Sequence, residues 1–242
     1  MESGLIDLAI YCAMIVLFAW IGGVIPLLFH KKIVIIQFFI SFGAGILLGA
    51  ALLHMVPGAA EYIGKRLGLP VLLGFLTLFI LEKFIMTHPC PAEHCEYHTV
   101  GLTAFIGLSV HSVITGLALG SGILIPRLGF IVFLAVLLHK LPASLSLSSL
   151  LVKEHYSRNK IFLIILLFSV MVPLGAFSTY FLIQKASVHT LGVLAAFSAG
   201  TFLHVAADDL MPEVHQHFRY RKTRLLVFLL GLLVMWLVTI LD

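Results

Sequence analysis

The feature that most constrains this 242-residue sequence is a series of eight apolar stretches. A helix needs about 20 predominantly apolar residues to span the hydrocarbon core, where no water is available to satisfy its backbone. The approximate boundaries of the stretches are 5–29, 33–57, 68–86, 99–121, 127–152, 160–183, 189–211 and 224–241. We therefore expect an all-α membrane protein, an eight-transmembrane-helix bundle with residues 1–242 forming a single domain.

The composition excludes a soluble domain. Apolar residues make up 61% of the chain and charged residues 11%, whereas soluble domains average about 45 to 50% and about 25%. No shift in composition marks a second domain. The amino terminus has Glu2 and Asp7 but no Lys or Arg, so it lacks the basic segment of a cleaved signal peptide. We expect the first span to be retained.

The basic residues predict the orientation, because cytoplasmic loops carry an excess of Lys and Arg. If the amino terminus lies outside, four basic residues lie on the external side: Lys65, Arg66, Arg127 and Lys185. The cytoplasmic side then holds ten: Lys31, Lys32, Lys83, Lys153, Arg158, Lys160, Arg219, Arg221, Lys222 and Arg224. We expect both termini to be extracellular or lumenal, and these residues to anchor helix ends rather than bind nucleic acid.

Two histidines lie near the midpoints of the fourth and fifth spans, His111 in HSVITG and His139 in HKLPAS. A charged side chain there costs roughly 2.5 to 3.5 kcal/mol on insertion scales, so such groups usually face a protein interior, a water-filled cavity or one another. The short turn near Pro126 makes the spans antiparallel neighbours. Ser112 and Thr115 follow His111 along the same helix. The sequence predicts a midplane pocket of two imidazoles and two hydroxyls, which suits a metal ion.

Paired segments give the chain an inverted-repeat character, which is common in transporters with midplane sites. The two hexads form one pair. A second pair is HMVP, which begins at His54, and DLMP, which begins at Asp209. The charge count puts His54 near the external end of its span and Asp209 near the internal end of its own. The two groups therefore flank the central pocket and suggest a path for an ion.

Four segments together resemble the ZIP (Zrt/Irt-like) family of divalent metal transporters. HSVITGLALG, residues 111–120, is similar to the HSVFEGLALG type of signature, and HKLPASLSLSSLL from His139 resembles the HK and SLSL pattern of one subfamily. VPLG, residues 172–175, resembles the sixth-helix PLG motif. FSAGTFLHVAADDLMPE, residues 197–213, resembles the seventh-helix pattern. The similarity covers nearly the whole chain.

The resemblance implies a secondary transporter rather than an enzyme, with Zn²⁺ as its main substrate and Fe²⁺, Mn²⁺ or Cd²⁺ as others, moved toward the cytosol. His111 and His139 match the family's metal-binding histidines, and Ser112 matches a second ligand position. Lys140 occupies a second-site position that is acidic or an amide in other subfamilies. Because a protonated lysine cannot coordinate a metal, we expect one ion at the site. No prosthetic group is expected.

Three acidic positions of the family have lost their carboxylates and are Thr115, Ala143 and Val172 here. Zinc usually has four ligands from Cys, His, Asp or Glu, so two histidines with hydroxyls make a weak site. Either other residues complete the site or the metal chemistry is altered.

Four more ionisable residues are candidate ligands: His54, His204, Asp208 and Asp209. An interhelical hydrogen bond is favoured over metal binding for His204. Asp209 matches the family's acid better than Asp208, which could instead pair with Lys140 and so reduce the cost of burying both.

The loop HPCPAEHCEYH, residues 88–98, resembles the histidine-bearing loop of many ZIP proteins. Its metal candidates are His88, Cys90, His94, Cys95 and His98. The spacing of Cys90 and Cys95 lies outside the common C-x₂₋₄-C pattern of zinc sites, so a transient metal-receiving loop and a solvated linker are both open. Cys12 is expected to pack within the first span.

We expect alternating access, with the ion entering past His54, binding at midplane and leaving toward Asp209, His204 and the loop. Two other interpretations stay open. One is a membrane-embedded zinc-dependent lipid hydrolase, against which stand eight predicted spans and the lack of an H-E-x-x-H motif. The other is a transport-impaired receptor or structural protein with the ZIP fold. The sequence does not decide between plasma membrane and organelle membrane, and it leaves a homodimer open.

Overall fold

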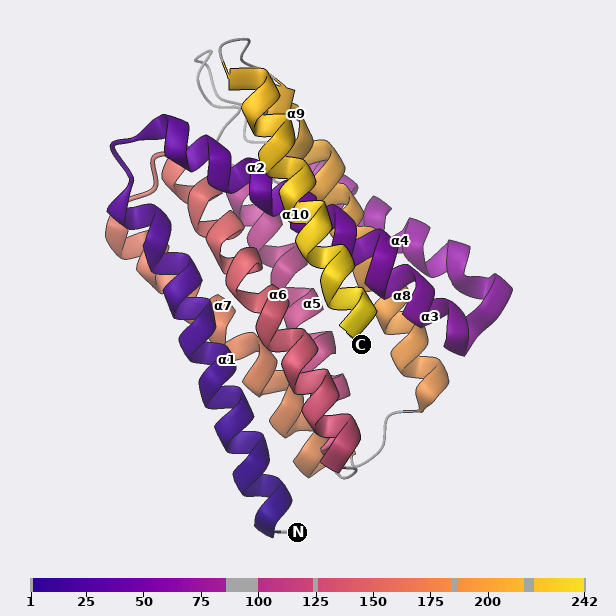
Figure 1. Cartoon of the computed structure of the whole chain (residues 1–242). Helices are drawn as coiled ribbons and strands as arrows, with labels where there is room; N and C mark the ends of the chain where they lie inside the picture. Colours follow the sequence, from indigo (N-terminus) through magenta and orange to yellow (C-terminus); the bar gives the residue numbers. More distant parts are fainter. Residues whose placement is uncertain (1, 86–99, 124–125, 184–186, 216–219, 242) are drawn as a thin grey trace.

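A computed structural model describes residues 2–85, 100–123, 126–183, 187–215 and 220–241, and every regular element in this part of the chain is helical (Figure 1). Seven helical stretches in it are long and apolar enough to cross a membrane: Gly4–Leu28, Ile33–Phe84, Val100–Gly122, Val132–Lys153, Arg158–Phe181, Val188–Leu210 and Arg221–Ile240. The chain is therefore a multi-pass membrane protein.

The elements follow one another along the chain with short connections. The helices are α1 (Glu2–Leu28), α2 (Ile33–Gly49), α3 (Val56–Ile63), α4 (Gly68–Ile80), α5 (Val100–Gly122), α6 (Pro126–Lys153), α7 (Arg158–Ser178), α8 (Val188–His204), α9 (Met211–His215) and α10 (Arg221–Leu241). Four π-helical segments, η1 (Ala50–Met55), η3 (Leu81–Ile85), η5 (Thr179–Ile183) and η6 (Val205–Leu210), and the 3₁₀ segment η2 (Gly64–Leu67) continue or join them.

The stretch Ile33–Phe84 is 52 residues long and reverses direction within its length. Gly64 has φ of 55°, a left-handed conformation that glycine adopts without steric cost, and it ends α3. The ribbon turns back at this point into α4 (Figure 1). The helical first arm continues past Pro57 to Ile63.

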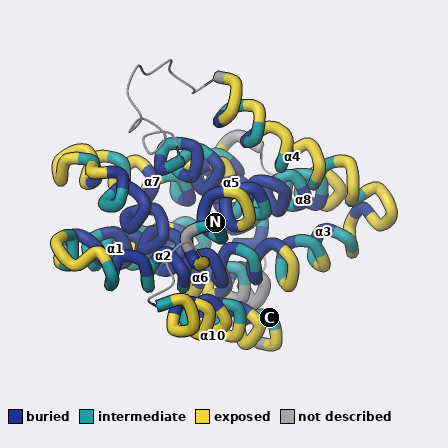
Figure 2. Tube along the Cα trace, turned by 90° about the horizontal axis from the view of Figure 1, so that it is seen from above, coloured by how far each residue is buried: buried dark blue, intermediate teal, exposed yellow. Residues whose placement is uncertain are grey.

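The two central helices are α5 and α6. In α6, 83% of the most apolar 18-residue window is buried, against 28% in α10. Seen from above, exposed residues gather on α1, α4 and α10, while α5, α6 and α8 show mostly buried surface (Figure 2). The outer helices direct large apolar side chains such as Ile6, Leu72 and Leu226 outward, as expected for surfaces that face lipid.

Four pairs of helices make the most extensive contacts: α1 with α6, α5 with α7, α2 with α10, and α4 with α8. Glycines allow the backbones to approach. A Cβ atom on Gly45 would overlap the carbonyl oxygen of Phe228, and one on Gly231 would overlap that of Phe42. Such close approach through small residues is typical of membrane helix packing.

Serines fix α6 against α1. Ser144 donates a hydrogen bond to the carbonyl oxygen of Ala19 (2.5 Å), and Ser148 donates one to that of Gly23 (2.6 Å). Because the two serines are four residues apart, they lie on one face of α6. These bonds hold the helix that carries His139 at the centre of the bundle. Cys12 is buried in the first span and packs in the apolar cluster there.

Candidate metal centre

The two midspan histidines meet between α5 and α6. The Nε2 atom of His111 lies 3.5 Å from the Nε2 atom of His139, and both side chains are buried. Their ring planes are tilted by 56°, with centroids 5.5 Å apart. The two nitrogens therefore lie close together across one helix interface, a geometry in which one metal ion can bind both.

A third helix fixes the orientation of His111. The Oγ atom of Ser198 on α8 lies 2.6 Å from its Nδ1 atom, and the ring of Phe202 packs against the imidazole with centroids 4.2 Å apart. Ser198 was not among the candidate site residues predicted from the sequence. No sequence pattern points to its hydrogen bond, because it joins helices 87 residues apart.

Thr115 places a hydroxyl beside the histidine pair. Its Oγ1 atom donates to the carbonyl oxygen of His111 (2.8 Å) and lies 3.1 Å from Nε2 of the same residue. Since one lone pair of a hydroxyl stays available when its proton is donated, this oxygen can accompany the two imidazoles toward a cation.

Lys140 lies next to this group. Its Nζ atom donates to Ser112 Oγ (2.9 Å) and to the carbonyl oxygen of Phe168 (3.3 Å), and it lies 3.5 Å from the centroid of the Phe168 ring. Ser112 Oγ in turn donates to the carbonyl oxygen of Leu108. The Ser112 hydroxyl, which was predicted as a metal ligand, therefore accepts a hydrogen bond from the Lys140 amine.

A small cavity of about 10 Å³ separates these side chains, which is about the space of one water-sized sphere. It is lined by Leu108, His111, Ser112, Thr115, Val136, His139, Lys140, Ala143, Phe168 and Val172. Thr115, Ala143 and Val172, the three positions at which the family resemblance led us to expect carboxylates, all line the space beside the histidines.

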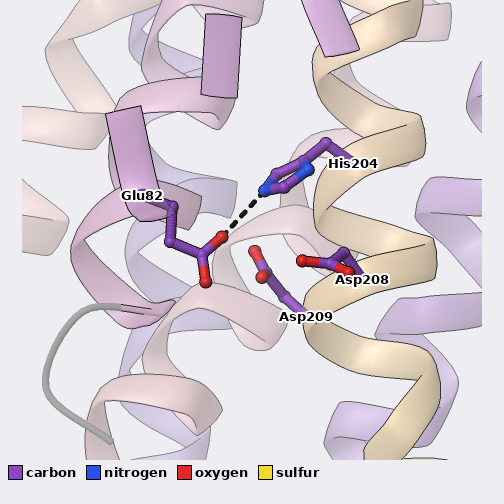
Figure 3. A group of neighbouring side chains, drawn as sticks. All are labelled: Glu82, His204, Asp208 and Asp209. Carbon is purple, nitrogen blue, oxygen red and sulfur yellow. Dashed lines mark hydrogen bonds and ion pairs between the residues drawn. The ribbon is translucent and has the colours of Figure 1, made fainter. Parts of the chain in front are cut away.

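A second group of ionisable side chains lies where η3 meets α8 and η6. It consists of Glu82, His204, Asp208 and Asp209, and one ligand atom from each lies within 4.8 Å of the others (Figure 3). The Nε2 atom of His204 is 2.8 Å from Glu82 Oε2. His204 thus makes the interhelical hydrogen bond that the sequence favoured, while it remains within a group that could hold a metal.

Some polar atoms of this second group have ion-pair or hydrogen-bond partners, and others have none among the described residues. Lys83 Nζ lies 2.7 Å from Glu82 Oε1 and 3.2 Å from Asp208 Oδ2. Within the described residues, Asp209 Oδ2 and His204 Nδ1 are buried with no hydrogen-bond partner. The suggested pairing of Asp208 with Lys140 is wrong, because α8 and η6 direct Asp208 toward the bundle end, where Lys83 lies.

Glu82 was missed among the sequence candidates, although a signal was present. It is the single acidic residue in the predicted span 68–86, and an ionisable residue in a span indicates a functional position. Its side chain is 3% exposed.

His54 is half-buried in η1, a segment that packs against α8, and it lies within electrostatic range of both His111 and His139. His88, Cys90, His94, Cys95 and His98 lie outside the described residues.

At the end of α6, Glu154 caps the start of α5. Its two carboxylate oxygens accept hydrogen bonds from the backbone N–H of Gly101 at 3.0 and 3.1 Å. Burial raises the pKa of this carboxyl to about 7, although the Gly101 N–H and the charge of Lys153 oppose the rise. The helix that carries His111 is therefore tied to the helix that carries His139 by an acid that titrates near neutral pH.

Comparison with known proteins identifies relatives. The family model described as ZIP Zinc transporter matches residues 88–239. A protein named Zinc transporter ZIP9-B from Xenopus laevis is 34% identical over 166 residues, which cover 62% of this chain and 55% of the relative. One named Zinc transporter ZupT from Chlorobium chlorochromatii is 25% identical over 225 residues, covering 81% and 83%. The chain spans little more than half the length of its ZIP9 relatives.

Proposed function

The chain belongs to the ZIP zinc transporter family, and on that premise we propose that it carries divalent transition-metal ions, zinc above all, across a membrane toward the cytosol. The observation that carries this proposal is the distance of 3.5 Å between the Nε2 atoms of His111 and His139. Two nitrogens bound to one tetrahedral Zn²⁺ at about 2.0 to 2.1 Å are about 3.4 Å apart. The pair is therefore arranged for a single zinc ion with little movement.

The proposed site holds one ion, with the two imidazoles and the Thr115 hydroxyl as protein ligands and water as the fourth. The cavity has room for one water-sized sphere, so a zinc ion must lose most of its hydration shell to enter. Lys140 occupies the neighbouring position with its amine solvated by Ser112 and Phe168. Its positive charge would replace a second ion rather than help to bind the first.

A neutral ligand set beside a lysine gives weak binding, which suits transport. An ion must bind strongly enough to enter a site and weakly enough to leave it. The missing carboxylates at Thr115, Ala143 and Val172 would otherwise attract the cation more strongly. We infer that this chain uses a low-affinity midplane site and differs in metal selectivity from relatives that keep those acids.

The group of Glu82, His204, Asp208 and Asp209 is proposed as the exit-side site. Its carboxylates offer charge that the midplane site lacks, and two of its buried atoms have no hydrogen-bond partner among the described residues. Glu82 lies four residues before residue 86, and the loop that carries the five histidine and cysteine candidates follows at residues 88–98. An ion would thus pass from His54, through the histidine pair, to these acids.

We propose that the chain crosses the membrane eight times, with Ile33–Phe84 counted as two passes, and that it contains an inverted repeat. The helix pairs support this. In the proposed repeat, α1 corresponds to α7, α2 to α8, α4 to α10 and α5 to α6. Under this correspondence the contact of α1 with α6 is equivalent to that of α7 with α5. The contact of α2 with α10 is likewise equivalent to that of α8 with α4. A structure of two related halves is suited to alternating access, in which one part moves against the other.

The π-helical segments η1 and η6 occupy equivalent places in this proposed repeat. Each is six residues long. His54 and Asp209 are the fifth residues of their segments, and Pro57 and Pro212 each follow two residues after the segment ends. Because π-turns often occur at functional sites, the two segments are natural places for entry and exit groups. The excess of basic residues at one end supports external or lumenal termini.

The test is metal flux into proteoliposomes that contain the purified full chain, across Zn²⁺, Fe²⁺, Mn²⁺ and Cd²⁺. His111→Ala and His139→Ala should each abolish zinc flux. His189→Ala is the matched control, because His189 is exposed at the start of α8, and it should transport as the parent does. Wild-type flux in either midspan variant would reject the site. Bound zinc without flux in the parent protein would favour the receptor interpretation, and lipid hydrolysis without flux would favour the hydrolase.

A further inference from the structure

A second and larger cavity lies at the end of the bundle where the α1–α2 and α6–α7 connections run side by side (Figure 1). Its volume is about 180 Å³, and it is lined by Leu27, His30, Val152, His155, Tyr156, Arg158 and Ile161. Since a water molecule takes up about 30 Å³ of liquid, the space admits a group the size of a small polyatomic ion.

The polar wall of the cavity is built by side chains from three helix ends. His30 Nδ1 lies 3.0 Å from the carbonyl oxygen of Leu27, which makes Nδ1 the donor and leaves Nε2 as an acceptor. Arg158 Nη2 lies 3.0 Å from that Nε2 atom and 3.1 Å from Nδ1, so the guanidinium contacts both ring nitrogens. A guanidinium has five N–H donors in a planar fork, so Arg158 keeps donors for a ligand while His30 holds it in place.

His155 reaches the cavity from a strained backbone position. Its φ is 58°, the one positive φ of a non-glycine residue within the described part of the chain. The bonds from the His155 N–H to the Val152 carbonyl oxygen and from the Tyr156 N–H to the Leu151 carbonyl oxygen form a Schellman motif. Glycine is the usual residue at this position, and another residue costs about 1 kcal/mol or more. His155 is an exposed residue that lines the cavity from this position.

The surrounding charge favours an anion. The two connections contain Lys31, Lys32, Lys153 and Lys160 besides Arg158. The one acid among them, Glu154, is 2% exposed and bound to the N–H of Gly101 on α5. A metal cation is disfavoured at this cavity, because the positively charged Arg158 guanidinium contacts His30. The N–H groups in the first turn of α7 add positive potential, since Ser157 makes no side-chain cap there.

We propose that this cavity binds a phosphate group, either the phosphate monoester of an anionic lipid headgroup or free inorganic phosphate. Arg158 matches phosphate as a two-pronged donor, and Tyr156 and the two histidines supply further polar contacts. Leu27, Val152 and Ile161 give an apolar floor between α1, α6 and α7. Basic pockets between transmembrane helices on the cytoplasmic side are known to bind phosphorylated headgroups. The proposal does not depend on metal transport.

The experiment measures binding to the detergent-purified full chain by native mass spectrometry. The probes are short-chain phosphatidylinositol 4-phosphate and, in a separate arm, inorganic phosphate. One bound headgroup is expected, and Arg158→Gln should weaken its binding about tenfold, the order expected for the loss of a charge-assisted bidentate contact. Lys160→Gln removes the same charge two residues after Arg158, at a position that does not line the cavity, and should change binding less than twofold. Binding of inorganic phosphate with the same Arg158 dependence would assign free phosphate, and binding in the lipid arm alone would assign a headgroup.

His155→Gly keeps the proposal testable if Arg158→Gln does not fold. Glycine suits φ of 58° without strain, so the variant should be as stable as the parent or more stable while it binds the phosphate probe more weakly. Equal losses in Arg158→Gln and Lys160→Gln would show diffuse charge attraction and overturn the proposal. So would unchanged binding in both Arg158→Gln and His155→Gly.

Discussion

The hydroxyl oxygen of Ser198 lies 2.6 Å from Nδ1 of His111, on the side of the ring opposite the nitrogen that faces His139. A hydrogen bond to the second ring nitrogen fixes the tautomer and the orientation of a metal-binding histidine. The geometry of the proposed site therefore depends on a residue from α8, a helix that contributes no ligand to it.

Ser198→Ala should weaken zinc binding at the midplane site about 10-fold to 100-fold, the usual effect of losing a second hydrogen bond of this kind. The measurement is the zinc concentration at half-maximal flux in proteoliposomes. Ser169→Ala is the control, since Ser169 is also buried but donates to a carbonyl within its own helix, α7. Equal effects in the two variants would mean that Ser198 acts only through packing.

Thr115→Glu should tighten zinc binding about tenfold or more, because a carboxylate in a poorly solvated site attracts a divalent cation strongly. Thr115 already points its oxygen toward the His111 imidazole. The maximal rate should fall, since the ion leaves more slowly. Thr115→Gln matches the size without the charge and should not tighten binding. If both variants bind alike, charge is not the limiting property of the site.

Glu82→Gln should lower the maximal rate of zinc flux about tenfold with little change in half-saturation, because the proposed exit-side group acts after the midplane step and loses a charged ligand. Glu61→Gln is the matched control, because Glu61 is exposed on α3. Both quantities come from the same flux measurements at varied zinc concentration. A change in half-saturation alone would place Glu82 on the entry side instead.

The pKa of Glu154, raised by burial to about 7 from 4.5, predicts a dependence of stability on pH. The folded state keeps this proton more strongly than the unfolded state does. The stabilising contribution is therefore complete below pH 4.5 and is lost as the pH rises through about 7, by about 3 kcal/mol at most. The Tm of the detergent-purified protein should fall between pH 5 and pH 8. Glu154→Gln, which cannot ionise, should show a smaller fall, and equal slopes would contradict the assignment.

Gly45→Ala should lower the Tm of the purified protein, because the added Cβ atom overlaps a backbone carbonyl of α10. Overpacking of this kind costs about 1 to 3 kcal/mol. Gly58→Ala adds the same atom on α3, where it would meet no atom beyond its own stretch of helix within 4 Å, and should leave the Tm unchanged or raise it. Since alanine has a higher helix propensity than glycine, propensity alone would not lower the Tm in either variant. Similar losses in the two variants would contradict the assignment of the effect to the α2–α10 contact.

The sequence predicted which segments are helices, because a chain in hydrocarbon must satisfy its backbone hydrogen bonds locally. Each membrane-spanning helix therefore appears in the sequence as an apolar stretch of about 20 residues, which can be recognised without knowing its tertiary contacts. The pairing of His111 with His139 was also accessible, since one short turn joins their helices and both residues lie near midspan. The position of Thr115 followed from its spacing to His111 along the helix, whereas that of Lys140 followed from the family resemblance.

Only the tertiary structure decided which partners come from other helices. Whether Asp208 reaches Lys140 or Lys83 depends on the depth and rotation of α8 and η6, and these are set by packing against α4 and α5. The same packing brings Ser198 to His111 and Glu82 to His204. Contacts of this kind join residues 87 and 122 positions apart, and apolar spans of similar composition can pack in many rotations. The local pattern therefore determines the helices, and the close approach of their backbones selects the side chains that meet.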